Sequence, residues 1–180
     1  GALFSGFYSI IASINNDFIA ASIAILVAMV LDGLDGRIAR FTNTQTSFGE
    51  YFDSLSDMIC FGLSPAILVY IWSSSLFELF TWQSNKIPWI LCFIYIASAA
   101  IRLARFNSKS QAQDKKYFIG LASPAAAAVI ITFIWMTESS SFTTDTSKWI
   151  SLAGLLLLSF LMISNITYYS FKDFNIRHKV

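Results

Sequence analysis

Apolar side chains dominate this chain in six segments, and short stretches rich in polar residues separate them. Apart from the first, each segment is close to the ~20 residues that an apolar helix needs to cross the hydrocarbon core of a bilayer. The pattern therefore predicts an all-α polytopic membrane protein with six transmembrane helices. Pro65 removes a backbone hydrogen bond from the third helix and is expected to kink it. The segments span residues 2–15, 18–40, 51–77, 87–106, 121–137 and 149–170.

The composition favours the same class of protein. Of the 180 residues, 56% are hydrophobic and only 13% are charged, which is more apolar surface than a soluble domain of this size can bury. We find no internal repeat and no linker long enough to divide the chain, so we expect a single domain over residues 1–180. Because the chain begins with Gly1 and its first apolar segment is short, we also expect that its N-terminus is truncated.

The basic residues are distributed unevenly along the chain. Most of the twelve lysines and arginines lie at the ends of the second, fourth and sixth segments, and only Lys86 and Lys148 lie at the opposite ends. The positive-inside rule therefore predicts that the ends rich in basic residues face the cytoplasm. All five tryptophans fall near the other surface, as an interfacial belt requires. The cytoplasmic basic residues are Arg37, Arg40, Arg102, Arg105, Lys109, Lys115, Lys116, Lys172, Arg177 and Lys179.

Four aspartates lie at the end of the second segment and the start of the third. Asp32 and Asp35 are three residues apart and Asp53 and Asp57 are four apart, so each pair lies on one face of its helix. Carboxylates this close repel one another, and at membrane depth they are costly unless a proton or a cation neutralises them. Two facing pairs form an all-oxygen site of the kind that Mg²⁺ or Mn²⁺ prefers. We therefore expect a divalent-metal site between helices 2 and 3, at the cytoplasmic side.

Two simpler interpretations account for parts of this pattern. The repeated Asp-Gly pairs are common turn signals, and Asp53 and Asp57 suit the start of a helix. Neither interpretation explains the i, i+4 spacing of the acids on the next helix, or Gly36 and Gly49, whose missing side chains leave space for a ligand. Arg40 lies one turn toward the cytoplasm, where it reaches a phosphate oxygen or anchors the helix at the interface.

The ordered spacing of these residues resembles the signature of the CDP-alcohol phosphotransferase family. Members of this family are integral membrane enzymes, usually homodimers with six transmembrane helices. They transfer a phosphatidyl or similar group from a CDP-linked donor to an alcohol and release CMP. The matching pattern in this chain is Asp32-x2-Asp35-Gly36-x2-Ala39-Arg40-x8-Gly49-x3-Asp53-x3-Asp57.

The resemblance also implies a role for each matched residue. Asp32, Asp35 and Asp53 correspond to ligands of two divalent cations, Mg²⁺ or Mn²⁺. Asp57 corresponds to a ligand of the second cation and to the general base for the acceptor hydroxyl. The remaining positions correspond to the nucleotide site: Gly36, Ala39 and Gly49 let the cytidine nucleotide approach the backbone, and Arg40 lies near its phosphates.

Further stretches resemble the family members that use L-serine as the acceptor and CDP-diacylglycerol as the donor. They include TNTQTSFGEYFDSLSDMICFGLSPA, AIRLARFN and FIGLASPAAA. A serine acceptor carries a carboxylate, which calls for a cation and for hydrogen-bond donors near the metal site. The candidates are Arg102, Arg105, Lys116, Asn107 and Ser123. Alternatively, these residues bind anionic lipid head groups at the membrane interface.

Two rival functions remain open at this point. The same transfer to glycerol 3-phosphate or an inositol phosphate would need a denser basic pocket, for which Arg102, Arg105, Lys115 and Lys116 are the candidates. An intramembrane cation transporter would need acids near mid-bilayer and usually repeated broken helices, but the acids here cluster at one face.

The expected partners of the chain are CDP-diacylglycerol, L-serine, membrane lipid and a second copy of the chain, with no nucleic acid. The resemblance further implies the inner membrane of a prokaryotic cell.

Overall fold

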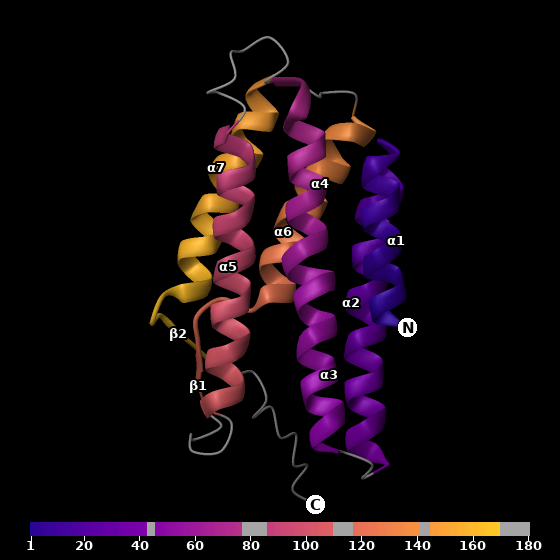
Figure 1. Ribbon diagram of the computed structural model, residues 1–180, viewed down its shortest axis with the longest axis vertical. Helices are drawn as coiled ribbons and strands as arrows, with labels where there is room; N and C mark the ends of the chain where they lie inside the picture. Colours follow the sequence, from indigo (N-terminus) through magenta and orange to yellow (C-terminus); the bar gives the residue numbers. More distant parts are fainter. Residues whose placement is uncertain (43–45, 77–85, 110–116, 141–144, 170–180) are drawn as a thin grey trace, which may run out of the picture.

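A computed structural model of the chain describes residues 1–42, 46–76, 86–109, 117–140 and 145–169. Within these ranges, helices pack side by side along one long axis and alternate in direction (Figure 1). The helices are α1 (Ala2–Ile14), α2 (Phe18–Phe41), α3 (Ser47–Asp57), the π-helix η1 (Met58–Leu63), α4 (Ser64–Ser73), the short 3₁₀-helix η2 (Ser74–Leu76), α5 (Lys86–Lys109), α6 (Ser123–Ser139) and α7 (Asp145–Ile163).

Four stretches of this bundle are long and apolar enough to cross a membrane. They are Phe18–Ile38, Phe48–Ser73, Lys86–Ser108 and Asp145–Ile163. The chain is therefore a helical integral membrane protein, which confirms the predicted class. The apolar helices α1 and α6 are shorter than these four, so the count of six spans stays a prediction.

Small residues bring α1 close to its neighbours. Ser5, Ser9 and Ser13 are buried at intervals of four residues, on the face that packs against the rest of the bundle. The Ser5 hydroxyl donates to the Ala24 carbonyl of α2 over 2.7 Å. Small side chains and hydroxyl bonds of this kind allow close helix packing where no hydrophobic force drives it. The packing fixes the start of α1 beside the middle of α2, where a Cβ on Gly1 would lie 3.3 Å from the Leu31 side chain.

A short antiparallel strand pair departs from the all-α expectation. The strand β1 (Tyr117–Ile119) pairs with β2 (Thr167–Tyr169), so the segment before α6 is joined to the segment after α7. Gly120 follows β1 with φ +80°, and a Cβ there would lie 2.5 Å from the Met162 carbonyl oxygen. Only glycine fits this approach. Strands of three residues leave too little periodicity to be read from a sequence.

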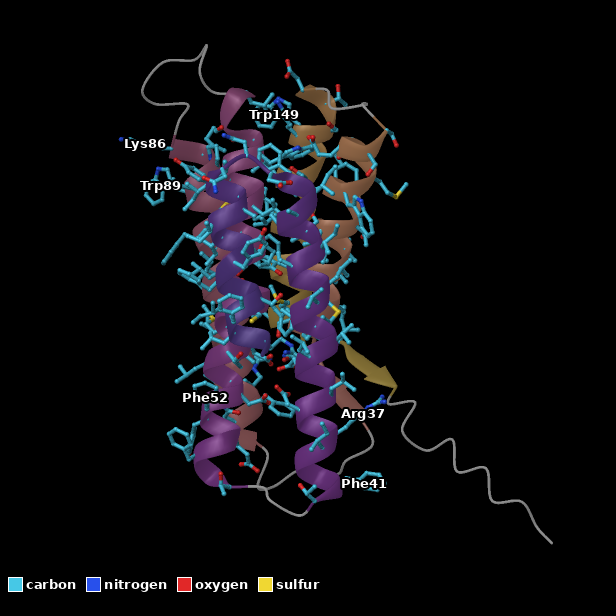
Figure 2. The ribbon with its side chains drawn as sticks, turned by 90° about the vertical axis from the view of Figure 1, so that its right-hand side faces the viewer. Arg37, Phe41, Phe52, Lys86, Trp89 and Trp149 are labelled. Carbon is cyan, nitrogen blue, oxygen red and sulfur yellow. The ribbon has the colours of Figure 1, made fainter. Side chains whose placement is uncertain are left out.

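The two ends of the bundle differ in their side chains. Lys86, Trp89 and Trp149 lie at one end, whereas Arg37 and Phe41 lie at the other (Figure 2). This separation agrees with the sequence-based expectation that tryptophans mark one surface and most basic residues the other. The aspartate-rich parts of α2 and α3 belong to the half that contains Arg37.

Candidate active site

Three of the four aspartates converge between α2 and α3. One carboxylate oxygen from each of Asp32, Asp35 and Asp53 lies within 4.8 Å of the other two. The helical spacing of Asp32 and Asp35 puts both on one face of α2, and α3 brings Asp53 opposite them. Asp32 is half-buried, and the other two are exposed. Such an acidic cluster of hard oxygen donors fits Mg²⁺ or Mn²⁺ and repels itself without a cation.

Asp57 lies one turn further along α3 than Asp53, nearer the middle of the bundle. Its carboxyl group lies close enough to that of Asp32 for the two to interact electrostatically. Its Oδ1 atom is buried and has no hydrogen-bond partner among the described residues. The structure thus places Asp57 at the edge of the three-carboxylate cluster, with one oxygen available to a ligand.

A cavity of about 700 Å³ opens beside the aspartates. Gly36 and Gly49, the predicted nucleotide-contacting glycines, both line it. A Cβ on Gly49 would meet Thr46 Oγ1 at 3.2 Å, because Thr46 caps α3 by accepting a bond from the Gly49 N–H. The side chains of Ala39 and Arg40, the other two predicted contacts, lie outside the part of the chain that the structure describes. The complete lining is Gly1, Ala2, Leu3, Phe4, Asp35, Gly36, Thr46, Gly49, Glu50, Phe52, Asp53, Ser56 and Phe106.

Two of the predicted acceptor residues lie together near Asp57. Arg102 of α5 donates through Nη1 to Ser123 Oγ over 3.1 Å, and Ser123 is fully buried in the first turn of α6. The Arg102 guanidinium also interacts electrostatically with the Asp57 carboxyl. Its Nε atom is buried and has no hydrogen-bond partner within the described ranges. A cation with a spare donor therefore stands beside the candidate base.

Other predicted acceptor residues have partners elsewhere. Arg105 Nη1 donates to the Ile163 carbonyl and to Asn165 Oδ1, each over 3.2 Å, at the C-terminal end of α7. Asn107 Nδ2 lies 3.0 Å from Ser54 Oγ and so joins the end of α5 to α3. Lys116 lies outside the described residues. A direct role for Arg105, Asn107 or Lys116 in binding an acceptor stays a prediction.

Sequence reasoning did not identify the aromatic and N-terminal lining of the cavity. Phe4, Phe52 and Phe106 come from α1, α3 and α5, and none of them belongs to the aspartate pattern. Their convergence depends on how the helices pack, which the periodicity of a single segment does not encode. Phe48 stacks on Phe52 with ring centroids 6.2 Å apart, which extends this group of aromatic side chains along α3.

Known proteins resemble the chain over most of its length. The family described as CDP-alcohol phosphatidyltransferase matches residues 1–164. A CDP-diacylglycerol–serine O-phosphatidyltransferase of Helicobacter pylori is 35% identical over 171 residues, covering 95% of this chain and 69% of that protein. An archaetidylserine synthase of Methanothermobacter thermautotrophicus is 37% identical over 167 residues, covering 91% of this chain and 64% of that protein.

Proposed function

This chain belongs to the CDP-alcohol phosphatidyltransferase family, and we propose that it transfers the phosphatidyl group of CDP-diacylglycerol to the hydroxyl of L-serine, giving phosphatidylserine and CMP. The observation that carries the proposal is the arrangement around Asp57. Its carboxyl group interacts electrostatically with Asp32 and Asp53 of the three-carboxylate cluster and with Arg102, whose guanidinium is bonded to Ser123. The relatives named as serine phosphatidyltransferases support the choice of acceptor.

The three-carboxylate cluster is the proposed metal site. Asp32, Asp35 and Asp53 would hold two divalent cations, Mg²⁺ or Mn²⁺, with Asp57 completing the second site. When bound, the cations would offset the negative charge of the pyrophosphate and of the departing CMP. The purely carboxylate donor set supports this assignment, as does the nearby Oδ1 of Asp57, which has no hydrogen-bond partner among the described residues.

The cavity beside the aspartates is the proposed nucleotide site. Gly36 and Gly49 would let the cytidine moiety approach the backbones of α2 and α3, as the family signature implies. Ala39 belongs to the same proposed surface, and Arg40 would bind a phosphate oxygen. The diacylglycerol part would stay in the bilayer, because its acyl chains gain nothing from leaving the hydrocarbon.

The acceptor would approach from the side of Arg102. Its carboxylate would pair with the guanidinium, whose Nε has no partner in the described parts of the chain, while Ser123 keeps the guanidinium oriented. Asp57 would then accept the proton of the serine hydroxyl as its oxygen attacks the lipid-side phosphorus. The bond from that phosphorus to the oxygen of CMP breaks, and CMP takes the electron pair.

We extend the proposal to the placement of the chain in its membrane. The apolar helices α1 and α6 would complete six spans, and the bundle would form one domain over residues 1–180 that pairs with a second copy. The end that carries Arg37 would face the cytoplasm of a prokaryotic cell, because most basic residues of the chain belong to that side. Water-soluble serine and membrane-bound donor would then meet at the inner surface of the inner membrane.

The rival acceptor within the family is a phosphorylated alcohol. Glycerol 3-phosphate or an inositol phosphate carries about two negative charges on its phosphate at neutral pH, so its site needs several cations. Among the described residues, Arg102 is the cation with an interaction to Asp57, and Arg105 is bonded to the end of α7. One guanidinium suits the single carboxylate of serine better than a phosphate.

The decisive experiment compares acceptors directly. Purified protein is incubated with CDP-diacylglycerol and Mg²⁺ or Mn²⁺, and CMP release is measured with serine, glycerol 3-phosphate, inositol phosphate or no acceptor. We expect release that depends on serine. Release with a phosphorylated alcohol but not with serine would overturn the acceptor assignment. With a donor of known phosphorus configuration, inversion supports direct attack, and retention would require a covalent intermediate instead.

A further inference from the structure

The helix that carries Asp53 and Asp57 changes its geometry immediately after Asp57. The π-helix η1 follows α3 without a break and leads into α4, so that the three form one continuous rod (Figure 1). A π-helical turn contains about one residue more than an α-helical turn, which rotates the rest of the helix by roughly 100°. The rotation lets α3 present its aspartates to α2 while α4 buries Leu68 and Trp72 in the core.

Contacts with α1 hold one side of this π-helix. The Ser64 hydroxyl lies 2.8 Å from the Ile59 carbonyl oxygen and 2.9 Å from the Gly6 carbonyl oxygen of α1. The Cys60 thiol donates to the Ala2 carbonyl over 3.3 Å. A Cβ on Gly6 would lie 2.6 Å from the Cys60 sulfur, so the two backbones approach as closely as glycine allows. The π-helix is thereby packed against the same end of α1 that lines the cavity.

A hydroxyl group of α5 bonds to the same π-helix. In a regular helix the N–H of residue 65 would bond to the carbonyl of residue 61, but Pro65 has no N–H. The Phe61 carbonyl instead accepts a hydrogen bond of 3.0 Å from the Tyr95 hydroxyl. Tyr95 and Phe61 are both fully buried. Loss of this bond would deprive the buried Phe61 carbonyl of the Tyr95 donor, and a lost hydrogen bond is costly in a protein core.

The position of Asp57 depends on this turn. Asp57 is the residue from which the π-helix begins, four residues before Phe61. Its Oδ1 has no hydrogen-bond partner within the described ranges, and the backbone turn that follows it helps to determine how deep its side chain lies. A π-helix that relaxed to α geometry would change the angle between the aspartates of α3 and the buried face of α4.

We infer that Tyr95 is a positioning residue for the transfer reaction, because its hydroxyl replaces the N–H that Pro65 lacks and so keeps η1 in the geometry that aims Asp57. The inference rests on the proposed role of Asp57. Tyr95 acts through the backbone of α3 and η1 and touches neither substrate. Its contribution is therefore expected in turnover rather than in substrate affinity.

The test removes the hydroxyl and keeps the ring. Tyr95→Phe is compared with Tyr70→Phe, a matched change at a tyrosine of α4 that is 42% exposed. We expect Tyr95→Phe to lower kcat by roughly ten- to a hundredfold, since a small misplacement of a reacting group has costs of this order. In Tyr95→Phe, the KM values for serine and for CDP-diacylglycerol should stay near those of the wild type. Mn²⁺ binding, measured by electron paramagnetic resonance, should also be unchanged. The control Tyr70→Phe should match the wild type in kcat, KM and Mn²⁺ binding.

A second variant tests the role of the hydroxyl as a substitute donor. Pro65→Ala restores a backbone N–H, so loss of the Tyr95 hydroxyl should lower kcat less in the Pro65→Ala background than in the wild-type chain. An equal loss in both backgrounds would overturn the inference. So would a fall in activity that merely parallels the loss of folded protein in a thermal melt.

Failure of the inference is separable from failure of the proposed function. If wild-type protein binds no Mn²⁺ and releases no CMP with serine, the proposed function fails, and the inference about Tyr95 fails with it. If wild-type protein is active and Tyr95→Phe has the same kcat as Tyr70→Phe, only the inference fails.

Discussion

Arg102 Nη1 lies 3.1 Å from Ser123 Oγ, and this bond joins α5 to the buried first turn of α6 at the level of Asp57. The Ser123 hydroxyl restrains one arm of the guanidinium, whereas the buried Nε has no partner in the described parts of the chain. A restrained cation with an unused donor loses little side-chain entropy when it binds a carboxylate. The bond thus prepares Arg102 for a small anionic acceptor.

The first prediction concerns Arg102. Arg102→Gln should raise the KM for serine by about tenfold or more, because a charged hydrogen bond to the substrate carboxylate contributes about 1.5–3 kcal/mol. The KM for CDP-diacylglycerol should change little. Steady-state CMP release at varied serine concentration measures both effects, and an unchanged KM for serine would remove Arg102 from the acceptor site.

The second prediction concerns Arg105, one turn further along α5. Because it bonds to the Ile163 carbonyl and to Asn165, Arg105→Gln should lower the melting temperature by a few degrees, the shift that about 1 kcal/mol causes in a domain of this size. The KM for serine should stay within about twofold of wild type, since the lost bonds anchor α7. A rise in that KM equal to the rise in Arg102→Gln would show that both arginines bind the acceptor.

The third prediction concerns the metal site. Asp35→Asn keeps the shape of the side chain but removes one negative charge from the three-carboxylate cluster, so the Mn²⁺ concentration for half-maximal activity should rise about tenfold or more. Glu50→Gln is the matched control, because Glu50 lines the same cavity from α3 and lies outside the cluster. If the two variants respond equally to titrated Mn²⁺, Asp35 is not a ligand.

Much of this fold follows from the apolar pattern. The predicted segment 18–40 corresponds to α2 at Phe18–Phe41, and 121–137 corresponds closely to α6 at Ser123–Ser139. The apolar pattern predicts that the third segment begins at residue 51, whereas α3 begins at Ser47. Its first turn is capped by the Thr46 side chain and contains Glu50, so hydrophobicity alone does not mark this start. Pro65 predicts a kink in this helix, and the apolar pattern gives no sign of the π-helix that precedes it.

The candidate site also has a part that the sequence predicts and a part that it does not. Local spacing predicts that the two aspartates of each pair share one helix face, and the packing of α3 against α2 then brings Asp53 to Asp32 and Asp35. Contacts between distant segments were not readable: the bond from Tyr95 to Phe61 spans 34 residues, and the bond from Arg105 to Asn165 spans 60. Such pairs depend on how helices pack, and a single sequence carries no periodic signal for them.

The fourth prediction concerns the glycine of α3 that lines the cavity. Gly49→Ala adds a Cβ 3.2 Å from Thr46 Oγ1, so the capping hydroxyl must shift and the cavity narrows. We expect the KM for CDP-diacylglycerol to rise about tenfold, the effect of about 1.4 kcal/mol of lost binding, with little change in the KM for serine. Gly154→Ala on α7 is the control, since its added Cβ meets none of the described residues within 4 Å. Equal KM values in the two variants would contradict the proposed nucleotide site.

The last prediction distinguishes the role of Asp57 as the proposed general base from the role of the clustered aspartates as metal ligands. Asp57 stands outside the set of three carboxylates whose oxygens lie within 4.8 Å of one another, although it contacts Asp32. Asp57→Asn keeps the shape of the side chain and removes its ability to accept a proton, so kcat should fall by roughly 10²–10⁴-fold, the usual contribution of a general base. Mn²⁺ binding should be largely retained.

Asp53→Asn provides the contrast on the same helix. Asp53 belongs to the cluster, so this variant should lose Mn²⁺ affinity together with activity, and added Mn²⁺ should recover part of the rate. Added Mn²⁺ should not rescue Asp57→Asn, because the missing function there is proton transfer. Turnover by Asp57→Asn at the wild-type rate would exclude Asp57 as the base, and rescue by Mn²⁺ would instead make it chiefly a metal ligand.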